Sequence, residues 1–516
     1  MSKIRLSQRL ITLTQTVFWL AIVVSAILMG LRLYSALSFF QPLHGMTRGV
    51  EFEPLYSTWR YIQDLPVYVS QREIPFIASF YNWLTYAFYG EIAAFVQAGL
   101  QLDDTWIPTL TRTTSFVGCV VGTAMLALVL MQSGRQRLVP IYAWGFAGFF
   151  FLGPLLGFWA MATGPDIWPL VIAAATLAFY QRVGARAPLV GVIVVCLASY
   201  AGWAFKQNYL FIPAVFGSYF LLIGAWGRAL TLALVVPVLI GVTVWLGSPD
   251  YARLLHFGGT AVSFSVANIV RNASNFGIKF LPLIVLSVLW VWLQRSHWLR
   301  WSHWQVGLRD NPGLSMGVIG IVIAGVVGTL TSGMVGASEN HYFWVALFLT
   351  IVGHDGFGRL IARARVGTQV WSLAAVSVGW GILIAAVMMV LTGQQGMSSV
   401  RPAHQALMQA QRCLKDLPTP VYVANPYLAL PWHVPSPDLS PGPFVTYYNY
   451  PTDREAGLEM EAGGIGGLIE QGYFKTLVLP TAVDSFDGGA LTLYVKQRQC
   501  EGYDVYRLVA QPGGGS

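Results

Sequence analysis

The chain has 516 residues, of which 55% are hydrophobic and only 10% are charged. About a quarter of the residues of an average soluble protein are charged, so this composition excludes a soluble globular protein. The net charge of +8 lies mostly in short loops between apolar runs, with no basic domain that could hold nucleic acid. The chain is therefore expected to be a polytopic α-helical membrane protein with no nucleic-acid partner.

Eleven apolar segments are candidates for crossing a bilayer. Starting from a cytoplasmic N-terminus, the segments expected inside hold fourteen Lys and Arg residues and two acidic ones, Asp310 and Asp355. Since Lys and Arg gather on the cytoplasmic side, this bias supports that orientation, and an odd number of spans puts the C-terminal region outside. The segments lie at about 11–35, 113–133, 138–160, 167–181, 188–205, 209–226, 229–247, 277–294, 313–335, 341–357 and 370–392.

The first external loop, 36–112, carries the most distinctive chemistry. Glu51 and Glu53 follow the first span, and the aromatic segment 76–89 is expected to form a helix in the membrane interface. Residues two apart share a face in a strand but not in a helix. In a strand both glutamates could face a substrate. In a helix one would do so and the other would pair with an Arg such as Arg48 or Arg60. The alternative for each is a solvated loop charge.

Other charged residues fall on the same expected side. Asp166 is interpreted as a functional carboxylate or as a helix N-cap, and it can be both at once. His341 opens the tenth span, where a hydrogen-bonded helix-start residue is the alternative to a ligand. Four cations could bind a phosphate diester or merely reach lipid headgroups, namely Arg112, Lys206, Arg271 and Lys279.

Residues 393–512 are expected to form a small external α/β domain. Strands are predicted at 420–424, 473–479 and 503–510, and helices at 403–415 and 457–471. In an oxidising compartment Cys413 and Cys500 could form a disulfide; two unpaired thiols are the alternative. Residues 513–516, with the sequence GGGS, are interpreted as an expression scar.

Several short motifs occur in a distinctive order. They are EFEPLY at 51–56, PVY at 66–68, FYNWLTY at 80–86, Arg112 with Ser115, Pro165-Asp166, Lys206-Gln207 and NHYF at 340–343. In this order, over about residues 1–392, the chain resembles the GT-C superfamily, multi-pass glycosyltransferases that take sugars from polyprenyl-phosphate donors, especially its dolichyl-phosphate-mannose type. The sequence departs from the family pattern by Glu in place of Asp, no Pro-Pro pair and no Arg before Pro165.

This resemblance implies transfer of one sugar from a polyprenyl-phosphate donor to a lipid- or glycan-linked hydroxyl outside a bacterial inner membrane. The catalytic candidates are Glu53, Glu51 and Asp166, with Glu53 slightly favoured because its Glu-x-x-Tyr spacing matches the family. Donor phosphate would meet Lys206, Arg271, Lys279, His341 and Arg112. The leaving phosphate needs stabilisation either by such cationic side chains or by a divalent cation, Mg or Mn, and no cofactor is assigned. The residues expected to contact the acceptor or the sugar are Tyr56, Tyr81, Asn82 and Trp83. The alternatives are a lipid or polysaccharide transporter and an oligosaccharide ligase.

Overall fold

The computed structural model describes most of the chain. The described residues are 2–38, 51–69, 79–133, 140–153, 155–260, 264–298, 304–334, 337, 339–366, 374, 377, 379–384, 387, 391, 405–406, 408–425, 427–436, 461–481, 485–486 and 489–509.

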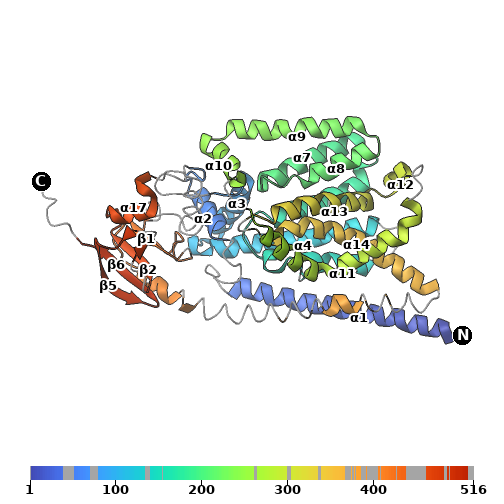
Figure 1. Ribbon diagram of the computed structural model, residues 1–516, viewed down its shortest axis with the longest axis horizontal. Coiled ribbons are helices and arrows are strands. Elements are labelled where there is room, and N and C mark those ends of the chain that lie inside the picture. Colours follow the sequence, from blue (N-terminus) through green and yellow to red (C-terminus); the bar gives the residue numbers. More distant parts are fainter. Residues whose placement is uncertain are drawn as a thin grey trace.

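Long apolar helices form the body of the molecule (Figure 1). Eight helical segments of the described part are long and apolar enough to cross a membrane, and α5 and α8 are shorter apolar helices. The predicted span at 370–392 lies mostly outside the described residues. The helices of this body are α1 (Ser2–Ser38), α4 (Ile107–Ser133), α5 (Pro140–Phe151), α6 (Ile167–Phe179), α7 (Pro188–Phe205), α8 (Phe211–Leu222), α9 (Trp226–Leu246), α11 (Val266–Trp298), α12 (Trp304–Asp310), α13 (Pro312–Thr331) and α14 (Phe343–Val366).

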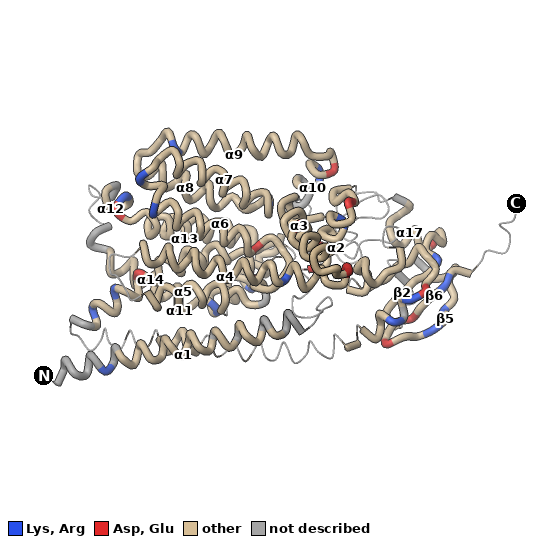
Figure 2. Tube along the Cα trace, turned by 180° about the vertical axis from the view of Figure 1, so that it is seen from behind, with Lys and Arg blue, Asp and Glu red and all other residues tan. Residues whose placement is uncertain are grey.

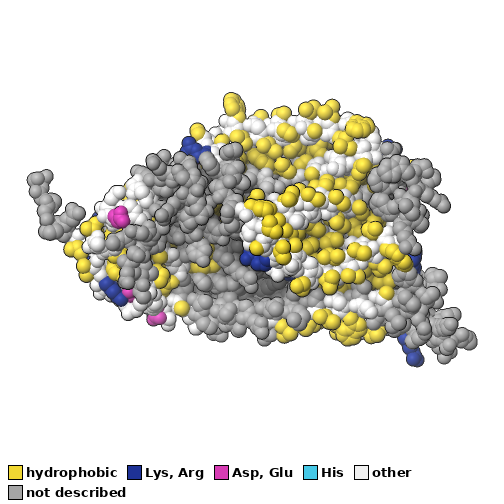
Figure 3. Space-filling view, in the orientation of Figure 1, with side chains coloured by type: hydrophobic (Ala, Val, Ile, Leu, Met, Phe, Trp, Pro, Cys, Tyr) yellow, Lys and Arg dark blue, Asp and Glu magenta, His cyan; other side chains and the backbone are white. Residues whose placement is uncertain are grey.

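Burial separates the central helices of the bundle from the peripheral ones. The segment containing α14 is 89% buried, packed against α11 and α13, whereas only 11% of α9 is buried. Apolar side chains of α9, such as Leu234 and Trp245, are exposed. Figure 3 shows hydrophobic side chains over much of the bundle surface. An exposed apolar surface of this extent is what a lipid-facing bundle requires.

Two predicted spans are shorter than the sequence indicated. The apolar run 138–160 forms a helix only as far as Phe151, and a 3-10 turn (Gly157–Ala160) follows. Gly157 has a positive φ of 61°, a conformation that favours glycine and takes the chain out of helical geometry. The run 209–226 is helical over Phe211–Leu222 and is followed by Gly224, with φ of 74°.

The segment predicted as the first external loop, 36–112, contains two helices at one end of the bundle, α2 (Phe52–Ile62) and α3 (Trp83–Leu100). The two glutamates therefore lie on a helix and at its N-cap, not on a strand. The interface helix expected at 76–89 begins instead at Trp83 and runs to Leu100, while residues 76–78 lie outside the described part. The Asn82 side chain accepts the Trp83 N–H and so fixes that start. A short helix, α10 (Pro249–Thr260), lies at the same end (Figure 1).

The C-terminal region folds around a four-stranded sheet in the order β1-β2-β6-β5. Strands β1 (Val421–Val423), β2 (Thr476–Pro480) and β6 (Tyr503–Leu508) match the three predicted ones, and β1 runs parallel to β2. Strand β5 (Tyr494–Cys500) was not predicted because its side chains are mostly exposed and polar, as suits an edge strand. The remaining elements are a small hairpin, β3 (Ser485–Phe486) with β4 (Gly489–Ala490), and the helix α17 (Gly464–Glu470).

The helices predicted in this region are present in its described residues. Residues 405–406 and 408–411 of the predicted helix 403–415 are helical, and a 3-10 turn (Arg412–Leu414) follows. Helix α17 lies within the predicted helix 457–471, after a 3-10 turn (Glu461–Gly463). Cys500 is disulfide-bonded. The side chain of Cys413 lies outside the described part, so its pairing with Cys500 stays a prediction.

Helix α2 lies between the sheet and the bundle (Figure 1). Phe52 is buried in the core of the C-terminal region, with its ring edge-on to Tyr427 at 4.3 Å between centroids. About one and two turns further along, Leu55 and Trp59 pack with Leu430. The C-terminal region thus covers one face of the helix that carries Glu53.

Candidate functional site

The carboxylate of Glu53 is buried on the face of α2 that turns toward α3. It is 3% exposed, and its Oε1 accepts hydrogen bonds from the hydroxyls of Tyr86 at 2.5 Å and Ser57 at 2.8 Å. Among the described residues no Lys, Arg or His forms an ion pair with it. Burial raises the pKa of Glu53 to about 8, against the opposing effect of hydrogen bonds from Tyr86, Ser57 and the Phe80 backbone. Such a group can hold or release a proton near neutral pH.

Glu51 has a different environment only two residues away. It is 1% exposed and forms an ion pair with Arg112 through Nη2 at 2.5 Å and Nε at 3.1 Å, while the Thr163 N–H donates to its Oε1 at 2.7 Å. The prediction that, in a helix, one of the two glutamates would pair with an Arg is confirmed, but the Arg is not one of the two that were named. The partner is Arg112 of α4, whereas Arg60 donates to the Pro66 carbonyl and Arg48 lies outside the described residues.

Asp166 occupies the N-cap position of α6, but its side chain makes no capping hydrogen bond. Its Oδ1 instead forms an ion pair with Lys206 Nζ at 3.0 Å and accepts a hydrogen bond from the Tyr209 hydroxyl. Both charged side chains are largely buried, 11% exposed for Lys206 and 3% for Asp166. Burying a charge costs free energy unless the charge is paired. Asp166 and Lys206 therefore compensate each other's charge at this end of the bundle.

Tyr81 connects the two acidic positions. The pKa of its hydroxyl is raised well above the usual value by burial and by the negative charges of Asp166 and Glu53, so both carboxylates act on one phenol. Lys206 Nζ lies 5.7 Å from the centre of the same ring. Gln207 Nε2 donates to the Phe80 carbonyl, which ties the turn after α7 to the first external loop.

The predicted phosphate-binding residues are only partly brought together. Lys279 forms an ion pair with Glu339 at 2.7 Å, and the neighbouring Asn340 reaches Asp166 at 3.5 Å. His341 shares a hydrogen bond of 2.8 Å with Thr331, as expected for the alternative of a hydrogen-bonded helix-start residue. Arg271 is exposed on α11, and the described contacts do not join it to this cluster.

The four predicted sugar-contacting residues also divide by environment. Tyr56 packs against Trp59 on the face of α2 covered by the C-terminal region. Asn82 has structural contacts: it caps α3, accepts from Tyr251 and donates to the Trp203 carbonyl. Trp83 begins α3, and its indole Nε1 is buried without a hydrogen-bond partner in the described part. Of the four, Tyr81 lies closest to the charged groups.

Sequence reasoning missed three residues that complete the site, Tyr86, Tyr209 and Thr163. Tyr86 ends the motif FYNWLTY at 80–86, but no role was assigned to it; it donates to Glu53. Tyr209 follows Lys206 by three residues, a spacing that one turn brings together. Thr163 uses its backbone N–H, for which a side-chain pattern gives no signal.

A metal site was an open expectation. In the ranges that the structure describes, no three His, Cys, Asp or Glu side chains come together as a set of metal ligands. Glu51 and Asp166 each face a cation instead. The residues present therefore do not fit a divalent cation at this place, and no step is assigned to one.

No family model and no curated protein matches the sequence. Among solved structures, the chain is similar to the oligosaccharyltransferase of the archaeon Archaeoglobus fulgidus in the apo form, with a TM-score of 0.54 over 90% of this chain and 69% of that one. That protein is a GT-C membrane enzyme. This chain has a GT-C-type fold. At 12% identity the GT-C likeness concerns the fold alone.

The GT-C-type bundle carries its charges at its two ends. Figure 2 shows Asp and Glu where α2 and α3 lie, and Lys and Arg at the opposite end near α8, α12 and α14. Glu53 and the Asp166–Lys206 pair lie at the end of the bundle that carries α2 and α3.

Proposed function

We propose that this chain is a membrane glycosyltransferase that moves a single sugar from a polyprenyl-phosphate donor to a hydroxyl of a lipid- or glycan-linked acceptor. The observation that carries the proposal is the contrast between the two glutamates. Glu51 is neutralised by Arg112, whereas Glu53 is buried, without an ion pair among the described residues, and has a pKa of about 8. A general base works best when its pKa lies near the working pH.

The chemistry follows from the groups present. Glu53 takes the proton of the acceptor hydroxyl as that oxygen attacks the anomeric carbon. The bond from this carbon to the phosphate oxygen breaks, and its electron pair leaves with the lipid phosphate. Direct attack inverts the anomeric centre. Lys206 is the proposed cation for the leaving phosphate, since a fixed positive charge stabilises negative charge that develops there.

The proposed setting is a bacterial inner membrane, with the N-terminus inside and the C-terminal region outside. Lys and Arg residues lie near α8, α12 and α14, at the end of the bundle away from the C-terminal region, which supports this orientation (Figure 2). The acceptor would approach from the external side. The lipid tail of the donor would lie between membrane helices.

The test is transfer by purified protein from a radiolabelled polyprenyl-phosphate monosaccharide. Glu53→Gln should lower the rate by about 10²–10⁴-fold, the usual contribution of a positioned base. Asp64→Asn, on an exposed residue just after α2, is the matched control and should leave the rate unchanged. Full activity of Glu53→Gln would reject the base, and transport of labelled lipid across vesicles without transfer would favour a transporter.

Transfer of a whole oligosaccharide is a second candidate, supported by the oligosaccharyltransferase fold. The two reactions differ in the mass that the acceptor gains. We therefore compare a polyprenyl-phosphate monosaccharide with a polyprenyl-diphosphate oligosaccharide as donor and analyse the product by mass spectrometry. A gain of one sugar supports the first candidate, and a gain of the full glycan supports the second.

A further inference from the structure

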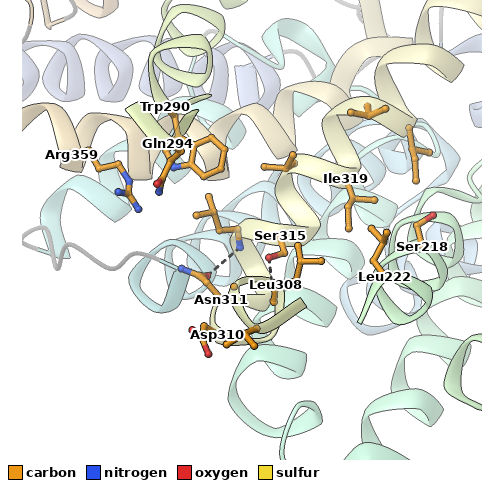
Figure 4. Close-up of a pocket in the computed structure, with 16 residues that line it drawn as sticks. Ser218, Leu222, Trp290, Gln294, Leu308, Asp310, Asn311, Ser315, Ile319 and Arg359 are labelled. Atoms are coloured by element: carbon orange, nitrogen blue, oxygen red, sulfur yellow. Dashed lines mark hydrogen bonds between the residues drawn. The ribbon is translucent and has the colours of Figure 1, made fainter. Parts of the chain in front are cut away.

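A groove of about 540 Å³ lies beside α12, at the end of the bundle opposite α2 (Figure 1), and its lining residues are drawn in Figure 4. Its wall consists of residues from α8, α11, α12, α13 and α14. Val306 and Val322 line it and are 59% and 62% exposed, so the groove opens at the lipid-facing surface of the bundle. It shares no lining residue with the candidate site.

The groove is long in the direction of a membrane helix. Its lining on α13 extends from Leu314 to Ile323. Nine steps at 1.5 Å per residue make about 13 Å along the helix axis. Between these ends the groove is lined by Val318, Ile319 and Val322. An apolar channel parallel to the helices and open to the bilayer suits a hydrocarbon chain, not a water-soluble ligand.

One end of the groove is polar. Figure 4 shows Arg359 and Gln294 close together there. Arg359 Nε donates to Asp355 at 2.6 Å, and its two terminal nitrogens donate to the Gln294 amide oxygen at 2.6 and 3.0 Å once that amide is oriented to accept. A guanidinium has five N–H donors. The described contacts use three, so two remain for an oxygen in the groove.

Asp355 keeps this guanidinium in place. Its Oδ2 also accepts the indole N–H of Trp290 at 2.7 Å, and both Asp355 and Trp290 are buried. The carboxylate holds Arg359 through Nε. Because Arg359 lines the groove, a phosphate oxygen there can accept one of the terminal N–H groups that Gln294 leaves free, in a single charge-assisted hydrogen bond.

We propose that this groove binds one acyl chain of a membrane glycerophospholipid, with the lipid phosphate at Arg359. The lipid would be a resident of the bundle, distinct from the sugar donor. An acyl chain between α8, α11 and α13 would fill the space that these helices leave open toward the bilayer. The proposal is independent of the glycosyltransferase assignment.

The test uses the full chain in nanodiscs and a phosphatidylglycerol with a photoreactive group near the end of one acyl chain. The peptide that contains 312–331 should be labelled. Val322→Trp fills the groove and should reduce that labelling roughly tenfold, since the chain loses its apolar contacts. Val326→Trp is the matched control: Val326 is 58% exposed on the same helix but does not line the groove, so labelling should persist.

A second probe tests the phosphate. Diacylglycerol with the same photoreactive chain lacks the headgroup and should label this peptide roughly tenfold less, as expected for loss of a hydrogen bond to a charged group. Equal labelling of Val322→Trp and the unmodified protein would overturn the site, and equal labelling by the two lipids would overturn the role of Arg359. Recovery of a polyprenyl phosphate from the groove by native mass spectrometry would overturn the assigned lipid class.

Discussion

The ring of Phe52 meets the ring of Tyr427 edge-on, with their centroids 4.3 Å apart. Phe52 begins α2 and directly precedes Glu53, while Tyr427 follows β1 of the C-terminal region. Asn425 bonds both to the Tyr427 N–H and to the Tyr503 hydroxyl of β6, so the partner ring is tied to the sheet. The sheet therefore acts on the position of the Glu53 carboxylate through one buried aromatic pair.

Removing this pair should affect transfer although it contacts no substrate. Phe52→Ala should cost about 3–5 kcal/mol of local stability, the usual range for a buried Phe truncated to Ala. We expect faster proteolysis of the C-terminal region and a lower kcat, because α2 loses its outer support. Phe52→Leu should restore most of both. Phe95→Ala, on an 81% exposed residue of α3, should change neither value.

The pH profile of transfer should report the Glu53 carboxyl group. Its pKa is raised, so below about pH 8 the group is mainly protonated and cannot accept a proton. Activity should therefore rise with pH, with a midpoint at about pH 8, and level off about one pH unit above it. Tyr86→Phe removes a hydrogen bond that favours the charged form, so the midpoint should move to higher pH. A midpoint unchanged in Tyr86→Phe would speak against Glu53 as the titrating group.

Glu51 should prove to be a structural residue. Glu51→Gln leaves the Arg112 guanidinium buried without its counter-charge, which typically costs about 3–5 kcal/mol. A lower Tm is the expected result. Replacing both partners, in Glu51→Gln with Arg112→Met, should recover part of the lost stability. If Glu51→Gln keeps its Tm but loses transfer, the roles of the two glutamates have been assigned the wrong way round.

Variants of the Asp166–Lys206 pair can separate its contribution to the stability of the fold from its contribution to the rate of transfer. Either Asp166→Asn or Lys206→Gln alone leaves one largely buried charge unpaired and should lower the Tm. The double variant removes both charges and should recover stability. Transfer should stay low in the double variant, because the cation proposed for the leaving phosphate is gone. Recovery of activity together with stability would show that the pair serves folding only.

The sequence by itself determined the kind of protein and most of its helices. Apolar length and sparse charge identify membrane helices without any tertiary contact, because the bilayer imposes both. Three of the four strands of the C-terminal sheet were also predicted, since their inward residues are apolar. The polar edge strand β5 was not, because edge residues face solvent and lack that signal.

The tertiary structure decided which charges work together. Glu51 and Glu53 are nearly equivalent in sequence, yet a helix sends one toward Arg112, 61 residues away, and the other toward Tyr86. Asp166 has the sequence signature of a helix cap, but its carboxylate instead accepts hydrogen bonds from Lys206 and Tyr209. A carboxylate takes its pKa and its role from burial and from partners distant in the chain, and only the packing of the helices fixes these.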